Sequence, residues 1–211
     1  MLTDHWPLRR LRLTTERLVL RLPTEDELAD LADLAAAGVH EPGERPFLTP
    51  WTDLEPAARA RYVIQDHWSS LGSWTPDDWA LDLAVFRDDL PLGLVTLSAR
   101  QFAVLREVRT GSWLGLAHHR KGYGTEARTA LLHLAFAGLG AEAALSEVFQ
   151  DNASSQTVSR KLGYRPDGIS RDVLHGEAVV SDRLRLTRAD WQPRPVEVEG
   201  LEQCRDFFGG Q

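Results

Sequence analysis

The 211-residue chain contains a single cysteine, Cys204, and this scarcity excludes two classes of small protein. One thiol cannot build a disulfide framework, and it cannot supply a zinc site made from cysteines. No apolar run approaches the roughly 20 residues that cross a bilayer. Residues 1–12 also lack the apolar stretch and the cleavage site of a secretory signal. We therefore expect a cytoplasmic protein that binds no membrane.

Positively charged residues are fewer than negatively charged ones. Lys and Arg number 24 against 31 Asp and Glu, which gives a formal net charge of −7 at pH 7. This balance argues against broad binding of nucleic acid, although it permits a local basic pocket. The chain is 43% hydrophobic and 26% charged, values that are ordinary for a folded protein. We expect a single domain at residues 1–192 and a short C-terminal extension at 193–211.

Hydrophobic periodicity predicts the element order β-α-α-β-β-β-α-β-α-β-β. Alternating apolar residues predict strands over 17–22, 79–86, 92–98, 108–116, 143–149, 169–174 and 179–186. Helical spacing predicts helices over 28–35, 57–71, 125–139 and 154–162. Thr24 and Glu27 match a capping box ahead of the first helix, and Gly38 is placed to end it.

The lengths of the connections predict the topology. The early strands are expected to be antiparallel, whereas the connection from Leu116 to Ala143 is long enough for a right-handed parallel crossover. The predicted fold class is therefore α/β (α+β), with a mixed, mostly antiparallel sheet and helices on both faces. Residues 39–56 contain four prolines and are predicted to form a loop. Whether the tail after Trp191 packs against the domain stays open.

A basic, glycine-rich segment lies between a predicted strand and a predicted helix, and it reads Arg120-Lys121-Gly122-Tyr123-Gly124-Thr125. Glycines let the backbone turn tightly there, and the free amides at a helix N-terminus attract an anion. The pattern favours a phosphate or pyrophosphate site. Its alternative is a plain turn with solvated basic residues.

Two nucleotide-binding motifs compete with that interpretation. The chain has no G-x-x-x-x-G-K-(S/T), which excludes a P-loop. Gly122, Gly124 and Ala127 do fit the dinucleotide pattern G-x-G-x-x-(G/A), with Glu142 and Glu147 about 20 residues further on. The preceding strand belongs to a predicted antiparallel meander rather than to a first βαβ unit, so an oxidoreductase is the less favoured interpretation.

A polar stripe is predicted on the helix that follows the next strand. Asn152, Ser155 and Ser159 have i, i+3 and i+7 spacing, which places them on one helical face. Such a stripe can hydrogen-bond an amide-rich ligand. Asn152 and Ser154 are also ordinary helix-capping residues, and this is the alternative.

Together the two segments resemble the GNAT superfamily of N-acetyltransferases, in its ribosomal-protein N-terminal acetyltransferase branch. The superfamily's acyl-CoA loop reads (Q/R)-x-x-G-x-(G/A), and here His119 replaces the first residue ahead of Gly122 and Gly124. The branch's pattern N-x-x-S-x-x-V-x-x-K-L-G-(F/Y) is matched at Asn152, Ser155, Val158, Lys161, Leu162, Gly163 and Tyr164. The resemblance covers about residues 13–191. The chain is also similar to an actinobacterial group in which succinyl-CoA is a suggested donor.

The resemblance implies a sheet that splays open beside its fourth strand and holds acetyl-CoA or succinyl-CoA there, without a metal. It implies that backbone groups near Leu116 and Ala117 pair with the pantetheine arm, and that Asn152 and Ser155 contact its end. It implies a pyrophosphate site formed by Arg120, Lys121, Gly122, Tyr123, Gly124 and Thr125.

The implied reaction is direct attack of a neutral amine on the thioester carbonyl in a ternary complex. A backbone amide near Leu116 would hold the oxyanion. Ser155 or Ser159 would return a proton to the leaving thiolate, because the tyrosine that many relatives use is absent at Ser159; Tyr164 is a third candidate. Glu107 is the candidate general base, and a solvated carboxylate is its alternative.

Arg109 stands at the strand position where relatives often carry a glutamate. An arginine cannot act as a base at neutral pH, but it could pair with the free carboxylate of a succinyl group. The alternatives are that Arg109 faces solvent or pairs with Glu107. The choice between an acetyl and a succinyl donor stays open.

The acceptor is expected to be a protein N-terminus, a lysine or a small-molecule amine. Residues 39–56, with Phe47 and Trp51, and residues 73–79 are expected to line its side of the site. A function of another class also stays open, namely an acyl-CoA-binding module of this fold with little or no turnover. Seven tryptophans and the apolar pair Phe207 and Phe208 suggest a homo-oligomer.

Overall fold

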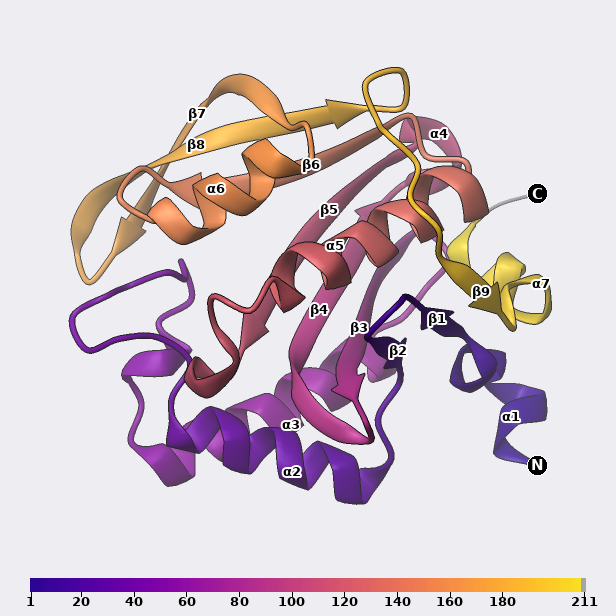
Figure 1. Ribbon diagram of the computed structural model, residues 1–211, viewed down its shortest axis with the longest axis horizontal. Helices are drawn as coiled ribbons and strands as arrows, with labels where there is room; N and C mark the ends of the chain where they lie inside the picture. Colours follow the sequence, from indigo (N-terminus) through magenta and orange to yellow (C-terminus); the bar gives the residue numbers. More distant parts are fainter. Residues whose placement is uncertain (210–211) are drawn as a thin grey trace.

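The computed structural model describes residues 1–209 and contains one nine-stranded sheet (Figure 1). The strands are β1 Arg12–Thr14, β2 Val19–Arg21, β3 Asp78–Arg87, β4 Leu90–Arg100, β5 Glu107–Leu114, β6 Ala143–Phe149, β7 Arg165–Leu174, β8 Glu177–Thr187 and β9 Glu197–Glu199. Their order across the sheet is β7-β8-β6-β5-β4-β3-β2-β1-β9. The β5–β6 pair is parallel and the other neighbours are antiparallel, which confirms the predicted mixed sheet and its crossover.

Helices cover both faces of this sheet. They are α1 Leu2–His5, α2 Glu25–Ala37, α3 Pro56–Gly72, α4 Phe102–Leu105, α5 Tyr123–His133, α6 Ala153–Lys161 and α7 Leu201–Cys204. In Figure 1, α5 crosses in front of β4 and β5, while α2 and α3 pack together against β3 and β4 from the other face. None of the helices within residues 1–209 is long and apolar enough to cross a membrane.

Local sequence signals set several helix ends. The Thr24 hydroxyl accepts a hydrogen bond from the Glu27 amide at 3.3 Å, and the Glu27 carboxylate accepts one from the Thr24 amide at 2.8 Å. This reciprocal pair is the predicted capping box, and it is confirmed. Arg21 binds the same carboxylate, and its hydrogen bonds lower the pKa of Glu27 to about 2. Helix α3 ends at Gly72, as predicted.

The strands β1 and β9 were not predicted. Each has three residues, which is too short for alternation to be recognised. They pair with each other, so the C-terminal tail adds an edge strand beside the first strand of the chain. The question that the sequence left open is thus answered, because the tail packs on the domain. Leu201, Cys204 and Phe208 are buried in the main core.

An aromatic cluster anchors the tail. The Phe208 ring lies edge-to-face against Trp79 at 4.9 Å and against Trp74 at 5.5 Å between centroids. The indole nitrogen of Trp74 donates to the carbonyl of Phe207 at 2.9 Å. Most of the tryptophans therefore pack within the monomer, and Trp68 is the most exposed at 53%. They do not by themselves argue for an interface, and the homo-oligomer stays a prediction.

Phe208→Ala is expected to destabilise the fold by about 3–5 kcal/mol, because it empties a fully buried aromatic site. Urea denaturation followed by tryptophan fluorescence measures this free energy. The exposed neighbour Gln203 provides the control, since Gln203→Ala removes no buried contact. A loss below 1 kcal/mol for Phe208→Ala would show that the tail contributes little to the core.

Candidate active site

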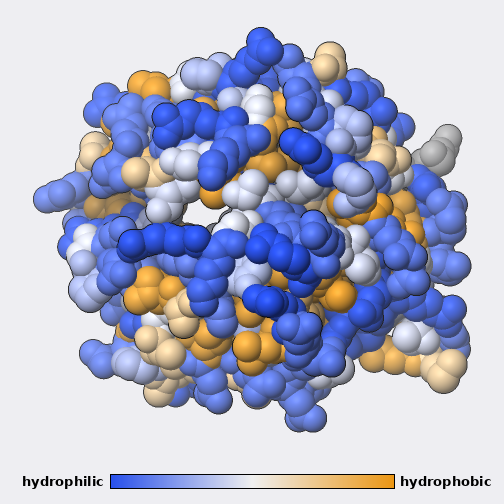
Figure 2. All heavy atoms as spheres, in the orientation of Figure 1, coloured by the Kyte–Doolittle hydropathy of each residue, from blue (hydrophilic) through white to orange (hydrophobic). Residues whose placement is uncertain are grey.

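A fork in the sheet forms the centre of the candidate site. Strands β5 and β6 pair over only three residues each, Glu107 to Arg109 with Ala143 to Leu145. Beyond this point β5 continues to Leu114 beside β4 alone, and β6 diverges from it (Figure 1). The predicted splay beside this strand is confirmed. The molecular surface is hollowed near the start of α5 and α6, within a largely hydrophilic rim (Figure 2).

The fork leaves backbone groups of β5 without a partner strand. The Gly115 amide donates to the Leu92 carbonyl of β4 at 2.9 Å. Because bonded residues alternate along an antiparallel pair, the amides of Ser112 and Leu114 point the other way, into the gap. The Leu114 carbonyl there contacts Nε2 of His119 at 2.9 Å. The free edge of β5 therefore runs along residues 110–114.

Leu116 and Ala117 lie just beyond this edge. They belong to a single 3-10 turn, and the Leu116 amide donates to the Gly38 carbonyl at 3.0 Å. The amides that face the gap in this structure are therefore those of Ser112 and Leu114, rather than those of Leu116 and Ala117. The roles of Leu116 and Ala117 in binding a donor stay predictions.

The glycine loop leads directly into α5. Gly122 is the N-cap of this helix and has a φ of 83°, a left-handed conformation that glycine adopts without strain. The first amides of a helix have no partner within it, so those of residues 123–125 are available to an anion. Arg120 and Lys121 are exposed beside them. The residues present thus fit a phosphate group.

Two residues near the N-terminus hold this loop in place. The Thr15 hydroxyl and the Arg17 amide donate to one Glu126 oxygen at 2.6 and 3.0 Å, and the Arg17 guanidinium binds the other oxygen. Arg17 also donates to the Lys121 carbonyl at 3.2 Å. The sequence patterns do not indicate this contact, because its partners lie 109 positions apart.

Helix α6 begins at the side of the fork. The Asn152 side chain accepts a hydrogen bond from the Ser155 amide at 3.0 Å, so Asn152 caps the helix, as its alternative interpretation proposed. Ser155 is half-buried, whereas Ser159 is fully buried and accepts from Arg128 at 3.4 Å. The Tyr164 hydroxyl lies 3.0 Å from the hydroxyl of Thr110. These catalytic assignments stay predictions.

Arg128 is a buried cation that sequence analysis missed. Its guanidinium lies beneath α5, is 3% exposed, and donates to Thr110 on β5 at 2.9 Å and to Ser146 on β6 at 3.2 Å. It therefore bridges the two strands close to where they part. It also lies over the Tyr164 ring, 5.4 Å from the centroid. No ion pair to Arg128 is found within residues 1–209.

The two charged residues at the start of β5 are already paired. Glu107 accepts a hydrogen bond from Arg185, which also binds Asp167 at 3.1 Å. Arg109 is largely exposed and donates to Glu147 on β6 at 3.1 Å. Of the two alternatives for Arg109, exposure to solvent agrees with the structure. The pairing with Glu107 is wrong, because Glu147 of the adjacent parallel strand accepts the hydrogen bond.

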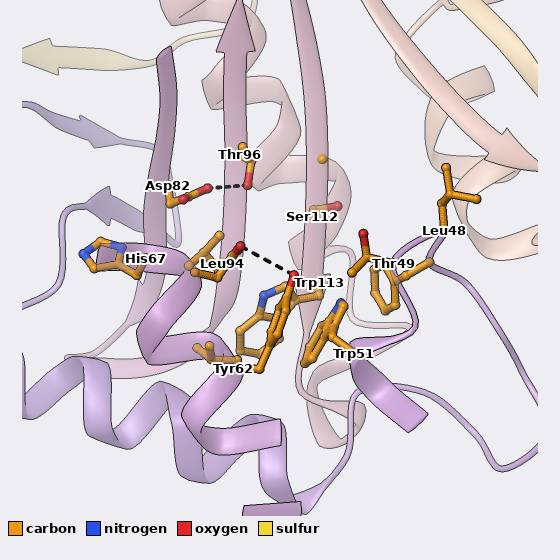
Figure 3. A pocket seen from close by; sticks show the side chains of 14 residues that line it. Leu48, Thr49, Trp51, Tyr62, His67, Asp82, Leu94, Thr96, Ser112 and Trp113 are labelled. Carbon is orange, nitrogen blue, oxygen red and sulfur yellow. Dashed lines mark hydrogen bonds between the residues drawn. The ribbon is translucent and has the colours of Figure 1, made fainter. Parts of the chain in front are cut away.

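A cavity of about 300 Å³ lies between α3 and the opposite face of β5. It is lined by Phe47, Leu48, Thr49, Trp51, Tyr62, Val63, Asp66, His67, Asp82, Leu94, Thr96, Gly111, Ser112 and Trp113. Figure 3 shows the rings of Trp51 and Trp113 side by side and Asp82 beside Thr96. Phe47 and Trp51 line this cavity, whereas Trp74 of the segment 73–79 packs against the C-terminal tail. That residues 39–56 line the acceptor side stays a prediction.

Burial sets the electrostatics of this cavity. Asp82 is 4% exposed and accepts a 2.6 Å hydrogen bond from the Thr96 hydroxyl. Loss of solvent raises the pKa of Asp82 to about 6 and lowers the pKa of buried His67 to about 4. The pKa of Tyr62 is raised to about 12, again mainly by burial. The cavity therefore carries negative charge at neutral pH, and its histidine and tyrosine are uncharged.

Comparisons with known proteins give one family match and several structural matches. The model of a family described as an acetyltransferase (GNAT) domain matches residues 17–165. RimL, a ribosomal L7/L12 alpha-N-protein acetyltransferase solved with coenzyme A, is 16% identical; the match covers 82% of this chain and 95% of RimL at a TM-score of 0.64. The microcin C7 self-immunity acetyltransferase MccE, solved with acetyl-CoA and AMP, is 15% identical, with 82% and 93% covered and a TM-score of 0.64.

A third solved structure, from Vibrio cholerae, is described as that of a candidate ribosomal-protein-serine acetyltransferase. It is 20% identical to this chain, with 83% of this chain and 97% of that chain covered and a TM-score of 0.63. At these identities the three structures establish a shared fold.

The raised pKa of Asp82 predicts how stability depends on pH. Its folded pKa of about 6 exceeds the value of about 3.9 in an unfolded chain, so the folded state loses stability as pH rises from 4 through 6. Asp82→Asn removes this titration and keeps an oxygen for Thr96. The stability advantage of the variant is expected to be about 2–3 kcal/mol larger at pH 8 than at pH 4.

Urea denaturation at the two pH values measures this difference. Asp78→Asn is the matched control, because Asp78 lies on the same strand and is exposed. An advantage of Asp82→Asn that does not change with pH would contradict the assigned burial of the charge.

Proposed function

The chain belongs to the acetyltransferase (GNAT) family, as its motifs predicted, and we propose that it transfers an acyl group from CoA to a primary amine through a ternary complex. The observation that carries this proposal is the meeting of three features at β5. They are the free backbone edge at residues 110–114, the anion-binding start of α5, and the acidic cavity on the opposite face. Donor and acceptor can thus approach one strand from its two sides.

The donor is proposed to lie in the fork with its pyrophosphate at the glycine loop. The amides of residues 122–125 and the side chains of Arg120 and Lys121 would hold the phosphates. The pantetheine arm would extend the sheet along β5 toward Leu116 and Ala117, and Asn152 and Ser155 would contact it from α6. Bound acyl-CoA supplies an activated thioester and a good leaving group.

The chain's own residues would serve the remaining needs of the reaction. A backbone amide of β5, at Ser112 or near Leu116, would donate to the developing oxyanion. Glu107, which the sequence suggested, is the first candidate for the general base. Asp82 is the second candidate, because its carboxylate lines the acceptor cavity. Ser155 or Ser159 would return the proton to the thiolate. The acceptor would be a protein N-terminus, a lysine or a small amine, in keeping with the ribosomal-protein branch that the motifs resemble.

A binding module with little turnover is the second candidate. Two residues that the sequence assigned to catalysis already form hydrogen bonds within the protein, Glu107 with Arg185 and Ser159 with Arg128. These bonds compete with a role in proton transfer. Release of free thiol from acetyl-CoA across a panel of amines separates the two functions. Tight CoA binding without thiol release on any amine would favour the module.

Gly124→Asp is expected to weaken CoA binding by about tenfold or more, because it places a negative charge among the amides that would hold the pyrophosphate. Calorimetry with CoA measures the affinity, and circular dichroism confirms the fold. Asp151→Asn is a matched surface control, since Asp151 is exposed and lies outside the glycine loop. Unchanged affinity in folded Gly124→Asp would place the donor elsewhere.

The acyl group is proposed to be acetyl, because Glu147 already pairs with the arginine that sequence assigned to a succinyl carboxylate. Acetyl-CoA should then be the better donor, and Arg109→Ala should leave the ratio of kcat/KM for the two donors unchanged. Steady-state rates with one common amine provide the test. If the mutation lowers relative use of succinyl-CoA about ten- to hundredfold, Arg109 binds the succinyl group.

A further inference from the structure

The acceptor cavity has a one-sided charge. Asp82 lies buried within it and Asp66 lies on its exposed side, where its carboxylate contacts the Tyr62 hydroxyl at 3.5 Å. Within residues 1–209, no lysine or arginine lines it, although the chain has 24 of them. His67 is uncharged there at neutral pH because burial lowers its pKa to about 4. An anionic ligand would find no counter-charge in this cavity.

Aromatic rings form the other part of its wall. The Trp51 ring stacks on Tyr62 at 5.5 Å with an angle of 9° between the planes, and it lies 5.7 Å from Trp113. Ring faces attract cations and also pack against aliphatic chains. Rings and carboxylates together are typical of sites that take an organic cation with an apolar stem.

The position of the cavity relates this charge to the reaction. Gly111, Ser112 and Trp113 line the cavity, and the same residues belong to the free edge of β5. Thr96 on β4 pairs with Gly111 and donates to Asp82 on β3, so the buried carboxylate lies across two strands from that edge. A ligand that reaches from the edge of β5 toward Asp82 would have one end at the backbone amides of β5 and the other end beside a buried carboxylate.

We propose that this cavity selects acceptors that carry a second positive charge besides the reacting amine, such as an α,ω-diamine or a lysine-like molecule with two amino groups. This inference rests on the proposed function. One nitrogen would react at the edge of β5, and the other would remain an ammonium ion paired with Asp82 or Asp66. A monoamine would leave these carboxylates without a cationic partner, and an acidic acceptor would be repelled by them.

The transfer itself balances without a further reactant. The neutral nitrogen forms a bond to the acyl carbon, the carbon–sulfur bond breaks, and the proton lost by the nitrogen ends on the CoA thiol. The distal ammonium takes no part in these bonds. Its charge contributes to recognition, so removing it should raise KM or lower kcat/KM rather than change the product.

The kinetic test compares three acceptors that each contain five carbons: 1,5-diaminopentane, pentylamine and 5-aminopentanoate. With acetyl-CoA, kcat/KM is expected to be about ten- to hundredfold higher for the diamine than for pentylamine, beyond the factor of two from its second amine. The aminopentanoate should be the poorest. Asp66→Asn should reduce the preference for the diamine, with less effect on pentylamine.

A direct binding measurement makes the inference independent of turnover. Calorimetry of 1,5-diaminopentane against the CoA-bound protein should show binding that weakens about tenfold or more in Asp66→Asn, a variant at an exposed position that is expected to fold. Asp78→Asn, outside the cavity, should bind as wild type. If thiol is released from acetyl-CoA but diamine and pentylamine react equally well in wild type and variants, the inference is wrong and the proposed function stands. If no amine releases thiol yet the diamine binds as described, the proposed function is wrong and the cavity is still a binding site for diamines.

Discussion

Arg128 joins the two strands of the fork, and the rest of the site depends on this contact. Its guanidinium is taken out of water and donates to hydroxyls on β5, β6 and α6 rather than to a carboxylate. Burying an unpaired cation costs free energy, so these hydrogen bonds are needed to offset it. Because Thr110 and Ser146 meet the same side chain, the strands are held at a fixed separation where their own ladder ends. The gap is thus built into the core of the domain.

The two faces of β5 have opposite electrostatic character. Alternation along the strand directs Thr110 toward α5, where Arg128 lies, and directs Trp113 toward the cavity beside α3. The first side ends in the basic glycine loop and the second contains Asp66 and Asp82. One extended strand therefore separates a region suited to phosphates from a region suited to cations. This separation explains how an acidic protein can offer a binding site to a polyanionic donor.

The features that were predictable from sequence depend on neighbours within one or two turns. The Thr24 capping box, the end of α3 at Gly72 and the tight turn at Gly122 are local, and the structure contains all three. Asp82 was missed because alternation through Leu81 and Leu83 identifies only one buried face of β3. Helix α3 covers the other face, and the sequence of β3 does not indicate that this face, which carries Asp82, is also buried.

The missed features share a dependence on distant partners. The clamp from Arg17 to Glu126 and the network around Arg128 each join segments that sequence patterns treat separately. The position of the free edge is a similar case. It follows from which residues of β5 bond to β4, and a shift of a single residue would reverse the set of amides in the gap.

The pairing of β1 with β9 has a consequence for how the domain forms during synthesis. The strand at residues 12–14 is synthesised first, whereas its partner at 197–199 and the ring of Phe208 follow only after all of the residues that form the rest of the sheet. Until then one edge of the sheet is unpaired and Trp74 and Trp79 lack their neighbour in the tail. Contacts of such long sequence separation form slowly, because a large loop must close before they are made. A nascent chain halted before residue 197 would contain nearly the whole candidate site and would still expose an unpaired strand edge that can pair with another chain.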